Sequence, residues 1–213
     1  MIVYCGKPFY RYRKVAQIKS SYSCLNTFRQ TMDKKVVEMN HIKRTERKLM
    51  YTGSMLSMYS DTIVTPDGNT AKWDYIEHSG AAAVVPVLED GRILLVRQYR
   101  NALDRETLEI PAGGINKGEE SLLAAARELE EETGYKSDNL THLISLVTAV
   151  AFCDEVIQIY VADNLQKTQQ HLDQDEYIEV EAYTTQDIAD MIYSGKIQDS
   201  KTIAAIMAYI NKK

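Results

Sequence analysis

The sequence contains few of the residues that mark secreted, membrane or disulfide-rich proteins. Its 213 residues include three cysteines, four prolines and one tryptophan. No run of eighteen or more apolar residues occurs, which argues against a membrane-spanning helix. The three cysteines show no metal-ligand spacing and no paired framework. Because no apolar segment follows the basic N-terminus, a secretory signal is not expected. We therefore expect free thiols in a reducing cytoplasm at Cys5, Cys24 and Cys153.

Acidic residues are absent from the start of the chain. Residues 1–31 contain six Lys and Arg residues and no Asp or Glu, although the whole chain has 25 bases, 30 acids and a net charge of −5. Residues 32–213 therefore carry a net charge of −11, which argues against nucleic acid as the main ligand. We interpret residues 1–31 as a basic extension from an upstream start site or a tail. An arm packed on a partner and a transit peptide are the alternatives.

Apolar residues make up 45% of the chain, which is enough for one sizeable domain with a small appendage. From about residue 40 to 78 the pattern predicts short strands, with a turn at Pro66–Asn69. Strands mixed with a few helices predict a sheet covered by helices. Alternation and short apolar runs predict further strands at Ala81–Leu88, Arg92–Tyr99, Thr107–Ile110, Leu143–Val150, Val156–Ala162 and Ile178–Tyr183, and helical spacing predicts helices at Glu120–Thr133, Thr185–Tyr193 and Ser200–Ile210.

The first predicted helix gathers negative charge on one edge. Its apolar positions Leu122, Ala126 and Leu129 recur at helical spacing, while Glu128, Glu131 and Glu132 stand at i, i+3 and i+4. Like charges at this spacing destabilise a helix by a few tenths of a kcal/mol per pair, unless a cation lies among them. Hard carboxylate oxygens suit Mg²⁺ or Mn²⁺. The alternative interpretation is a solvent-exposed acidic face.

The spacing around these carboxylates favours the metal-binding interpretation. The segment consists of Gly113, five residues, Glu119, seven residues, Arg127-Glu128-Leu129, one residue, Glu131-Glu132, one residue, and Gly134-Tyr135. It resembles the Nudix box, G-x5-E-x7-R-E-U-x-E-E-x-G-U, in which U is a bulky aliphatic residue. Seven fixed polar or glycine positions match. The departure is Tyr135 at the last aliphatic position, where a packing residue is expected.

The resemblance implies both a fold and a metal site. The implied fold is α+β, a Nudix α/β/α sandwich of a mixed sheet flanked by helices at 79–213, with a small N-terminal β-subdomain at 32–78. Gly113 and Gly114 would let the backbone approach phosphate and metal. Mg²⁺ is the implied cofactor, with Mn²⁺ possible, and it would polarise a diphosphate and supply hydroxide. The implied metal ligands are the carbonyl of Ala112 and the carboxylates of Glu128, Glu132 and Glu176, and the implied catalytic residues are Arg127, Glu131 and Glu176.

Sequences on both sides of the box resemble the ADP-ribose pyrophosphatase branch of the family, from about Val37 to the C-terminus. They are Leu94–Arg100, Leu108–Gly114, Phe152–Glu155 and Asp173–Val180. The resemblance implies that Glu176 is the catalytic base or a third metal ligand, and Asp173 and Asp175 compete for that role.

The same resemblance implies a substrate site and a partner. In this branch, residues before the box commonly reach the site of a second subunit, which implies a homodimer and a small-molecule nucleotide sugar as ligand. A core position for Trp73 and an ordinary surface position for His78 are the alternatives. The implied substrate-binding residues are Arg100 and Gly113 at the phosphates, Glu109 beside the diphosphate, Trp73 stacked on adenine and His78 on the same ligand.

The chain departs from the branch at Val147–Phe152, where the family usually has Ser or Thr, Pro and Gly before the Phe. Because that loop lies near the sugar, several functions stay open. The leading expectation is hydrolysis of ADP-ribose to AMP and ribose 5-phosphate. Another nucleotide sugar, such as GDP-mannose, is the second. A non-catalytic sensor that binds ADP-ribose is the third, but it predicts loss of box carboxylates, and all of them are present.

Overall fold

The computed structural model describes residues 41–54 and 56–212. The predictions for residues 1–31, Cys5 and Cys24 therefore lie outside the described residues, as does the start of the predicted N-terminal subdomain. From Ile42 onward the chain forms one compact unit. Cys153 is a free thiol. No helix in this part of the chain is long and apolar enough to cross a membrane. The cytoplasmic location stays a prediction.

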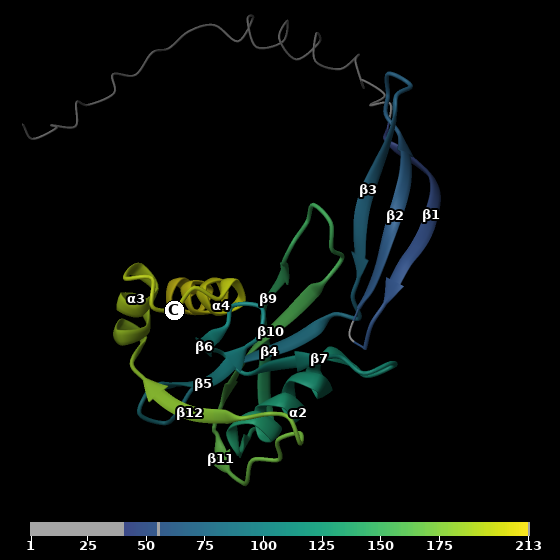
Figure 1. Cartoon of the computed structure of the whole chain (residues 1–213). Coiled ribbons are helices and arrows are strands. Elements are labelled where there is room, and N and C mark those ends of the chain that lie inside the picture. The colour runs from purple at the N-terminus through teal and green to yellow at the C-terminus, as the bar shows by residue number, and fades with distance from the viewer. Residues whose placement is uncertain (1–40, 55, 213) are drawn as a thin grey trace, which may run out of the picture. The chain divides into compact units, whose positions relative to one another are not determined.

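The first three strands form an antiparallel sheet in the order β1-β2-β3 (Figure 1). Their bounds are Lys43–Thr52, Ser57–Val64 and Thr70–Glu77. The predicted turn between β2 and β3 is confirmed: Gly68 N donates to Thr65 O at 2.9 Å, and Gly68 has φ 87°. That left-handed torsion is readily available to glycine.

A four-stranded sheet forms the centre of the fold, in the order β7-β4-β10-β9. Strands β4 and β10 run parallel, while β7 and β9 are antiparallel to their neighbours. Every residue of β4 is buried, as expected for a strand covered on both faces. The bounds are Ala81–Pro86 for β4, Ala112–Gly114 for β7, Asn139–Val147 for β9 and Val156–Asp163 for β10.

Two smaller sheets complete the strands. One is antiparallel, in the order β12-β5-β6, and the other pairs β8 with β11. Their bounds are Ile93–Arg100 for β5, Arg105–Glu109 for β6, Tyr135–Lys136 for β8, Gln166–Lys167 for β11 and Ile178–Tyr183 for β12. The two-residue strands and the three-residue β7 were not predicted, because such short segments carry no periodicity.

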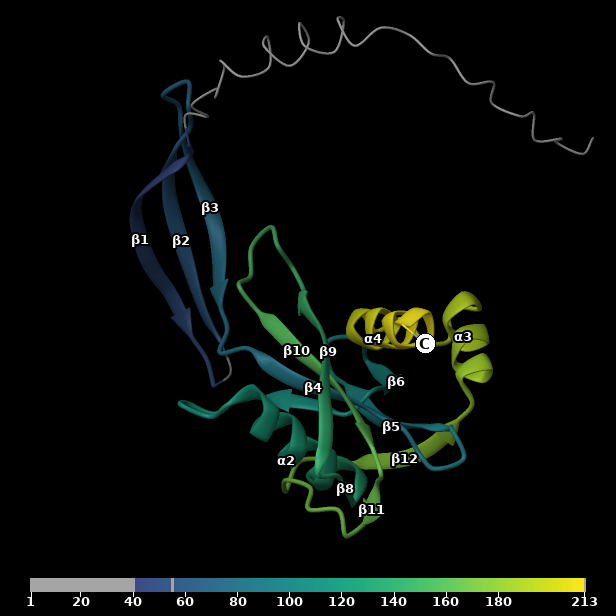
Figure 2. The same cartoon turned by 180° about the vertical axis from the view of Figure 1, so that it is seen from behind.

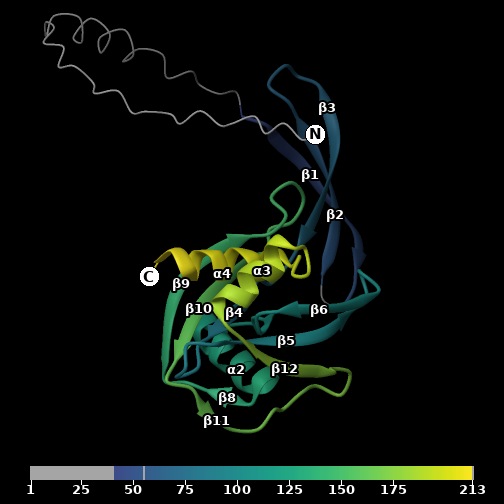
Figure 3. The same cartoon turned by 90° about the vertical axis from the view of Figure 1, so that its left-hand side faces the viewer.

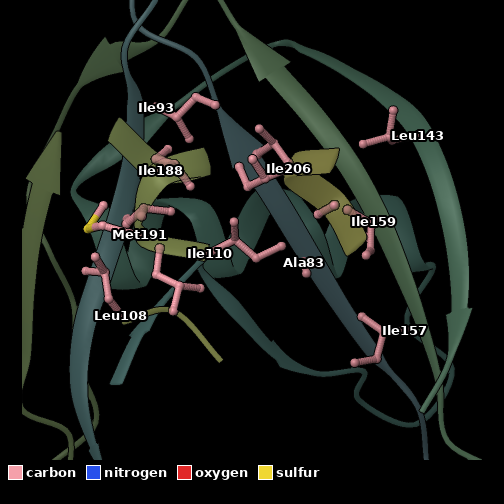
Figure 4. Close-up of a cluster of buried hydrophobic side chains, with 14 of the residues drawn as sticks. Ala83, Ile93, Leu108, Ile110, Leu143, Ile157, Ile159, Ile188, Met191 and Ile206 are labelled. Atoms are coloured by element: carbon pink, nitrogen blue, oxygen red, sulfur yellow. The ribbon is translucent and has the colours of Figure 1, made fainter. Parts of the chain in front are cut away.

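Three described helices cover the central sheet from opposite sides, α2 on one face and α3 with α4 on the other (Figures 2 and 3). The alternation of β4 explains this layering. Ala82 and Val84 pack with Ala124 and Leu129 of α2. The opposite face of β4 packs against α3 and α4 through Ile188, Met191 and Ile206, as Figure 4 shows around Ala83. The predicted α/β/α sandwich is confirmed. The helices span Ser121–Thr133 (α2), Thr185–Tyr193 (α3) and Ser200–Lys212 (α4).

The face that α2 buries differs from the predicted one. Leu122 is 44% exposed, whereas Ala124 and Ala125 are fully buried. The helix is therefore rotated so that Glu128 and Glu132 face the sheet edge together with Leu129. The helix prediction itself is confirmed, although only Leu129 of the two leucines at helical spacing is buried.

Candidate active site

A polar cavity of about 650 Å³ opens beside α2. It is bounded by the end of β5, the glycines of β7, one side of α2 and the loop before β12. Polar side chains dominate its wall, which suits a charged ligand rather than an apolar one. The cavity lining includes most of the predicted site residues: His78, Arg100, Ala112, Gly113, Arg127, Glu128, Glu131, Glu132 and Glu176.

Two carboxylates of α2 are buried at the base of this cavity. Glu128 is 8% exposed and Glu132 is 4% exposed, while Glu131 reaches the surface. Gly134 ends the helix with φ 67° and donates its N–H to Glu130 O at 2.9 Å. Burial of two acidic side chains one helical turn apart is costly without positive charge nearby.

The backbone of β7 lies directly against these carboxylates. A Cβ atom added to Gly113 would overlap the carboxylate of Glu128, whereas nothing lies within contact of one added to Gly114. Glu132 Oε2 accepts a hydrogen bond from Ala112 N at 3.0 Å. Gly113 therefore lies directly against the Glu128 carboxylate, and its approach to phosphate and metal stays a prediction.

Arg127 joins the acidic residues of the box. Its Nη1 donates to Glu128 Oε1 at 2.6 Å and to Glu131 Oε2 at 2.8 Å. Its Nε donates to Glu119 Oε1 at 3.0 Å, and its Nη2 donates to the carbonyl oxygen of Gly114 at 2.9 Å. Arg127 therefore orients the carboxylates, as the sequence predicts.

The clustered carboxylates of α2 carry more negative charge than Arg127 alone can neutralise. Burial raises the pKa of Glu132 to about 8, with the negative charges of Glu128 and Glu176 adding to the effect and the Ala112 N–H opposing it. Burial also raises the pKa of Glu128, against the opposing charge of Arg127. These groups and the Ala112 carbonyl are hard oxygen donors, so they fit a divalent cation. Within the described residues, no three His, Cys, Asp or Glu side chains stand close enough together to ligate an ion as they are.

The loop before β12 brings two of its three candidate carboxylates to the cavity. Glu176 and Asp173 both line the cavity, and Asp175 does not. The two residues close a turn, with Glu176 N donating to Asp173 O at 3.0 Å and Asp173 N donating to Glu176 Oε2 at 3.2 Å. Glu176 also lies close enough to Glu128 and Glu132 to affect the pKa of both.

Arg100 lines the cavity, but Glu109 lies behind it. Arg100 Nε and Nη2 donate to the two carboxylate oxygens of Glu109, each at 2.8 Å. Glu109 is buried and also pairs with Lys201. Burial by itself would raise the pKa of Glu109, but the hydrogen bonds and charges of Arg100, Lys201 and Thr107 outweigh it and lower the pKa to about 2. Glu109 is thus ionised and in contact with protein cations.

The two predicted contacts to the nucleoside have different positions. His78 lines the cavity, and its Nδ1 accepts the N–H of Gly80 at 3.0 Å. Because Nδ1 is an acceptor there, the approach of Glu155 Oε1 to 3.5 Å is not an ion pair. Trp73 lies on β3 opposite Asp61, is 49% exposed and does not line the cavity. The alternative position for Trp73 in the core is therefore wrong.

Three further residues that line the cavity were not predicted from the sequence. Gln98 lies two residues before Arg100 on β5, and its buried amide Nε2 has no partner among the described residues. Asn116 and His171 also line the cavity. The alternation of β5 was the available signal for Gln98, since positions 98 and 100 face the same side of a strand. Nothing in the local pattern distinguishes His171 from a surface histidine.

Comparison with known proteins supports the geometric interpretation. The family model described as the NUDIX domain matches residues 77–206. The chain is 36% identical over 166 residues to a Bacillus subtilis protein named ADP-ribose pyrophosphatase, covering 77% of this chain and 90% of that protein. A Mycobacterium tuberculosis protein of the same name is 32% identical, with coverage of 75% and 78%.

Two other similar proteins carry different names. A Bacillus methanolicus protein named methanol dehydrogenase activator is 37% identical over the same shares of the two chains, 77% and 90%. A crystal structure of an ADP compounds hydrolase superposes with a TM-score of 0.73 at 20% identity, covering 81% of this chain and 94% of that chain, which shows the fold. The box motif, the α/β/α layers and the matched family model agree, and the chain belongs to the NUDIX family of hydrolases.

Proposed function

We propose that the chain hydrolyses the pyrophosphate bond of ADP-ribose, with Mg²⁺, to give AMP and ribose 5-phosphate. The observation that carries the proposal is the cavity in which Glu128, Glu132 and Glu176 face the backbone of Ala112 and Gly113. The names of the Bacillus subtilis and Mycobacterium tuberculosis relatives support ADP-ribose as the substrate.

Each residue of the cavity has a separate part in the proposed reaction. Glu128, Glu132 and the Ala112 carbonyl would hold the cation, with Glu176 as a further ligand or as the base. When bound, a divalent cation neutralises phosphate charge and lowers the pKa of a water molecule. Arg127 keeps Glu128 and Glu131 oriented through its Nη1 hydrogen bonds.

The substrate and the attacking water are positioned by other groups. The exposed edge of the Arg100 guanidinium faces the cavity and would bind the diphosphate by paired hydrogen bonds. In the base role, Glu176 would accept a proton from the attacking water. Gln98 Nε2 provides an unpaired donor on the same wall.

The segment Val147–Phe152 would face the sugar of the substrate. It contains no Pro or Gly, and Val150 is exposed. Thr148 Oγ1 donates to Glu155 Oε2 at 2.7 Å, so the loop presents a polar pair beside Ala112 and Gly113 in an adjoining cavity. A different nucleotide sugar, such as GDP-mannose, is therefore the second candidate.

A substrate panel with Mg²⁺ and with Mn²⁺ tests the proposal. ADP-ribose, GDP-mannose, NADH and ADP-glucose would be incubated with the protein, and product nucleotides would be separated by chromatography. We expect AMP from ADP-ribose at the highest kcat/KM. Equal or higher kcat/KM for GDP-mannose would contradict the assignment of the sugar.

Two variants on α2 distinguish the loss of a metal ligand from the loss of any acidic side chain. Glu132→Gln should lower kcat by about 100-fold or more, because a ligand oxygen is lost while shape is kept. Glu130→Gln removes a carboxylate from the same helix that does not line the cavity, so it should keep full activity. Equal activity of the two variants would contradict the metal assignment.

The homodimer also belongs to the proposal, with the N-terminal sheet as the contact region. Within the described residues β1 is the outer strand of its sheet, and it exposes Leu49, Met50 and Tyr51. Exposed apolar side chains on an outer strand suit pairing with a second chain. Light scattering should give twice the mass of the chain. A monomer at concentrations at which the protein is active would contradict it.

A further inference from the structure

Glu109 is shared by two cations that come from different elements. Its Oε1 accepts from Arg100 Nε at 2.8 Å and from Thr107 Oγ1 at 2.6 Å. Its Oε2 accepts from Arg100 Nη2 at 2.8 Å and from Lys201 Nζ. With its side chain 3% exposed, Glu109 makes these bonds away from water, and both oxygens are fully used. The carboxylate therefore cannot also bind a ligand.

Arg100 retains donors for a ligand on its other edge. Nε and Nη2 hold Glu109, and Nη1 has no partner among the described residues. The side chain is 41% exposed and lines both the main cavity and an adjoining one of about 350 Å³. A long arginine side chain loses much rotamer freedom when it binds an anion. Here Glu109 has already fixed the guanidinium before any ligand arrives.

Lys201 is itself fixed by the start of α4. Asp199 Oδ2 accepts from Thr202 N at 2.9 Å, from Thr202 Oγ1 at 2.6 Å and from Lys201 Nζ at 3.0 Å. Thr202 Oγ1 also accepts the N–H of Ile110 at 2.9 Å, which ties α4 to the end of β6. Lys201 is buried to 9% exposure with its ammonium group against Glu109. The first turn of α4 therefore holds the Lys201 ammonium, itself paired with Asp199, against the carboxylate that binds Arg100.

We propose that Lys201 is a positioning residue, which acts through Glu109 to keep the Arg100 guanidinium oriented toward the diphosphate of the substrate. This inference rests on the proposed function, because it takes Arg100 as the phosphate-binding group. Lys201 Nζ and Arg100 Nη2 both donate to Glu109 Oε2. The ammonium therefore helps to fix the carboxylate that in turn fixes the guanidinium.

The test compares Lys201→Met with Lys201→Arg, and with Lys196→Met as a matched control on the exposed loop before α4. Affinity for ADP-ribose and for ADP would be measured by calorimetry in EDTA, and kcat and KM with Mg²⁺. We expect Lys201→Met to raise Kd and KM about 3- to 10-fold, the range for one charged hydrogen bond acting indirectly, with kcat nearly unchanged. Lys201→Arg should restore the affinity, and Lys196→Met should not change it.

A double variant separates positioning from direct contact. In an Arg100→Met background, Lys201→Met should cause no further loss of affinity, because its effect passes through the guanidinium. Additive losses would overturn the proposal and make Lys201 a direct ligand of the phosphates. An unchanged Kd in Lys201→Met, or a fall in kcat alone, would also overturn it. If Lys201→Met unfolds, Lys201→Gln replaces it in each comparison, with the same expected and contradicting results.

Failure of this inference and failure of the proposed function give different results. A wild-type protein that does not cleave ADP-ribose contradicts the proposed function. The Lys201 comparison is then made with whichever diphosphate compound of the panel the wild type cleaves. A wild type that cleaves ADP-ribose, together with unchanged affinity in Lys201→Met, contradicts only the role of Lys201.

Discussion

At the scale of single residues, Gly113 and Gly114 are neighbours with different structural requirements. Neither needs a left-handed backbone torsion, since the positive-φ glycines of the described chain lie elsewhere. The difference lies in what each faces. Behind Gly113 stands the carboxylate of Glu128, whereas Gly114 faces open space. A methyl group at position 113 must displace a side chain that the proposed reaction uses.

We predict that Gly113→Ala loses most activity and Gly114→Ala does not. Displacing Glu128 by about 1 Å should lower kcat/KM by about 100-fold, the scale of effect expected for a misplaced active-site group. Calorimetric titration with Mn²⁺ should show weaker metal binding in Gly113→Ala only. Equal kcat/KM in the two variants would show that Glu128 tolerates the displacement.

The sequence predicted the residues of the box better than the residues that support it. Glu128, Glu132 and Arg127 are close in sequence, so helical geometry alone brings them together. Lys201 is 92 residues from Glu109, and only the packing of α4 against β6 creates their contact. Glu109 was predicted beside the diphosphate, and the structure pairs it with protein cations instead. No local pattern carries that information.

At the scale of elements, β3 and the loop between β9 and β10 are joined by both backbone and side chains. Ile76 N donates to Phe152 O at 2.6 Å, and Asp154 N donates to Ile76 O at 3.3 Å. Tyr75 Oη donates to Asp154 Oδ2, and His78 N donates to Asp154 Oδ1 at 2.9 Å. The N-terminal sheet thereby fixes the loop between β9 and β10.

Arg47, on the opposite outer strand β1, also contacts Tyr75 and strengthens this connection. Its guanidinium carbon lies 3.5 Å from the centre of the Tyr75 ring, which is cation–π geometry. Its Nε and Nη2 donate to the two oxygens of Asp61 on β2, each at 2.7 Å. Side chains from all three strands therefore hold Tyr75 in place.

We predict that Tyr75→Phe loosens the loop without unfolding the protein. The ring and its contact with Arg47 remain, but Asp154 loses the phenolic donor, which contributes about 1.5–3 kcal/mol for a bond to a charged group. Hydrogen exchange should therefore quicken at residues 149–155 and at Ile76. Tyr59→Phe is the control, because its hydroxyl bonds Glu77 on the same sheet and does not reach the loop. Unchanged exchange in Tyr75→Phe would show that the backbone pairs suffice.

Sequence patterns identified the longer elements well, for a physical reason. Strands β4, β5, β10 and β12 are short apolar or alternating runs bounded by turns, and their predicted bounds differ from the observed ones by only a few residues. The bounds of β9 are less accurate: it begins at Asn139 rather than Leu143 and ends at Val147 rather than Val150. Segment 148–152 is apolar like a strand, yet it forms the loop that binds β3.

At the scale of the whole molecule, the buried Glu109 couples global stability to pH. Its pKa is lowered from the ordinary 4.5 to about 2 in the folded protein. A carboxyl group with a depressed folded pKa contributes stability above its unfolded pKa, and that contribution is lost as pH falls through the folded value. The contribution of Glu109 is therefore complete above about pH 4.5 and disappears between pH 4.5 and 2.

We predict that Glu109→Gln lowers the free energy of unfolding by about 3 kcal/mol at pH 7, because the buried Lys201 and the partly exposed Arg100 lose their shared anion. At pH 2 the difference between variant and wild type should nearly vanish, since wild-type Glu109 is then close to half-protonated or beyond. Urea unfolding at both pH values measures this. Glu106→Gln, an exposed change on the same strand, is the control. A difference that persists at pH 2 would contradict the linkage.

The pairing of Ile76 with Cys153 has a practical consequence for where this protein can be divided. The family model begins at residue 77, one position after Ile76. A fragment cut at that border would keep every carboxylate of the box but leave Phe152 O and Asp154 N without their strand partner. A fragment meant to keep this loop paired should therefore begin upstream of Ile76, and not at the first residue that the family model matches.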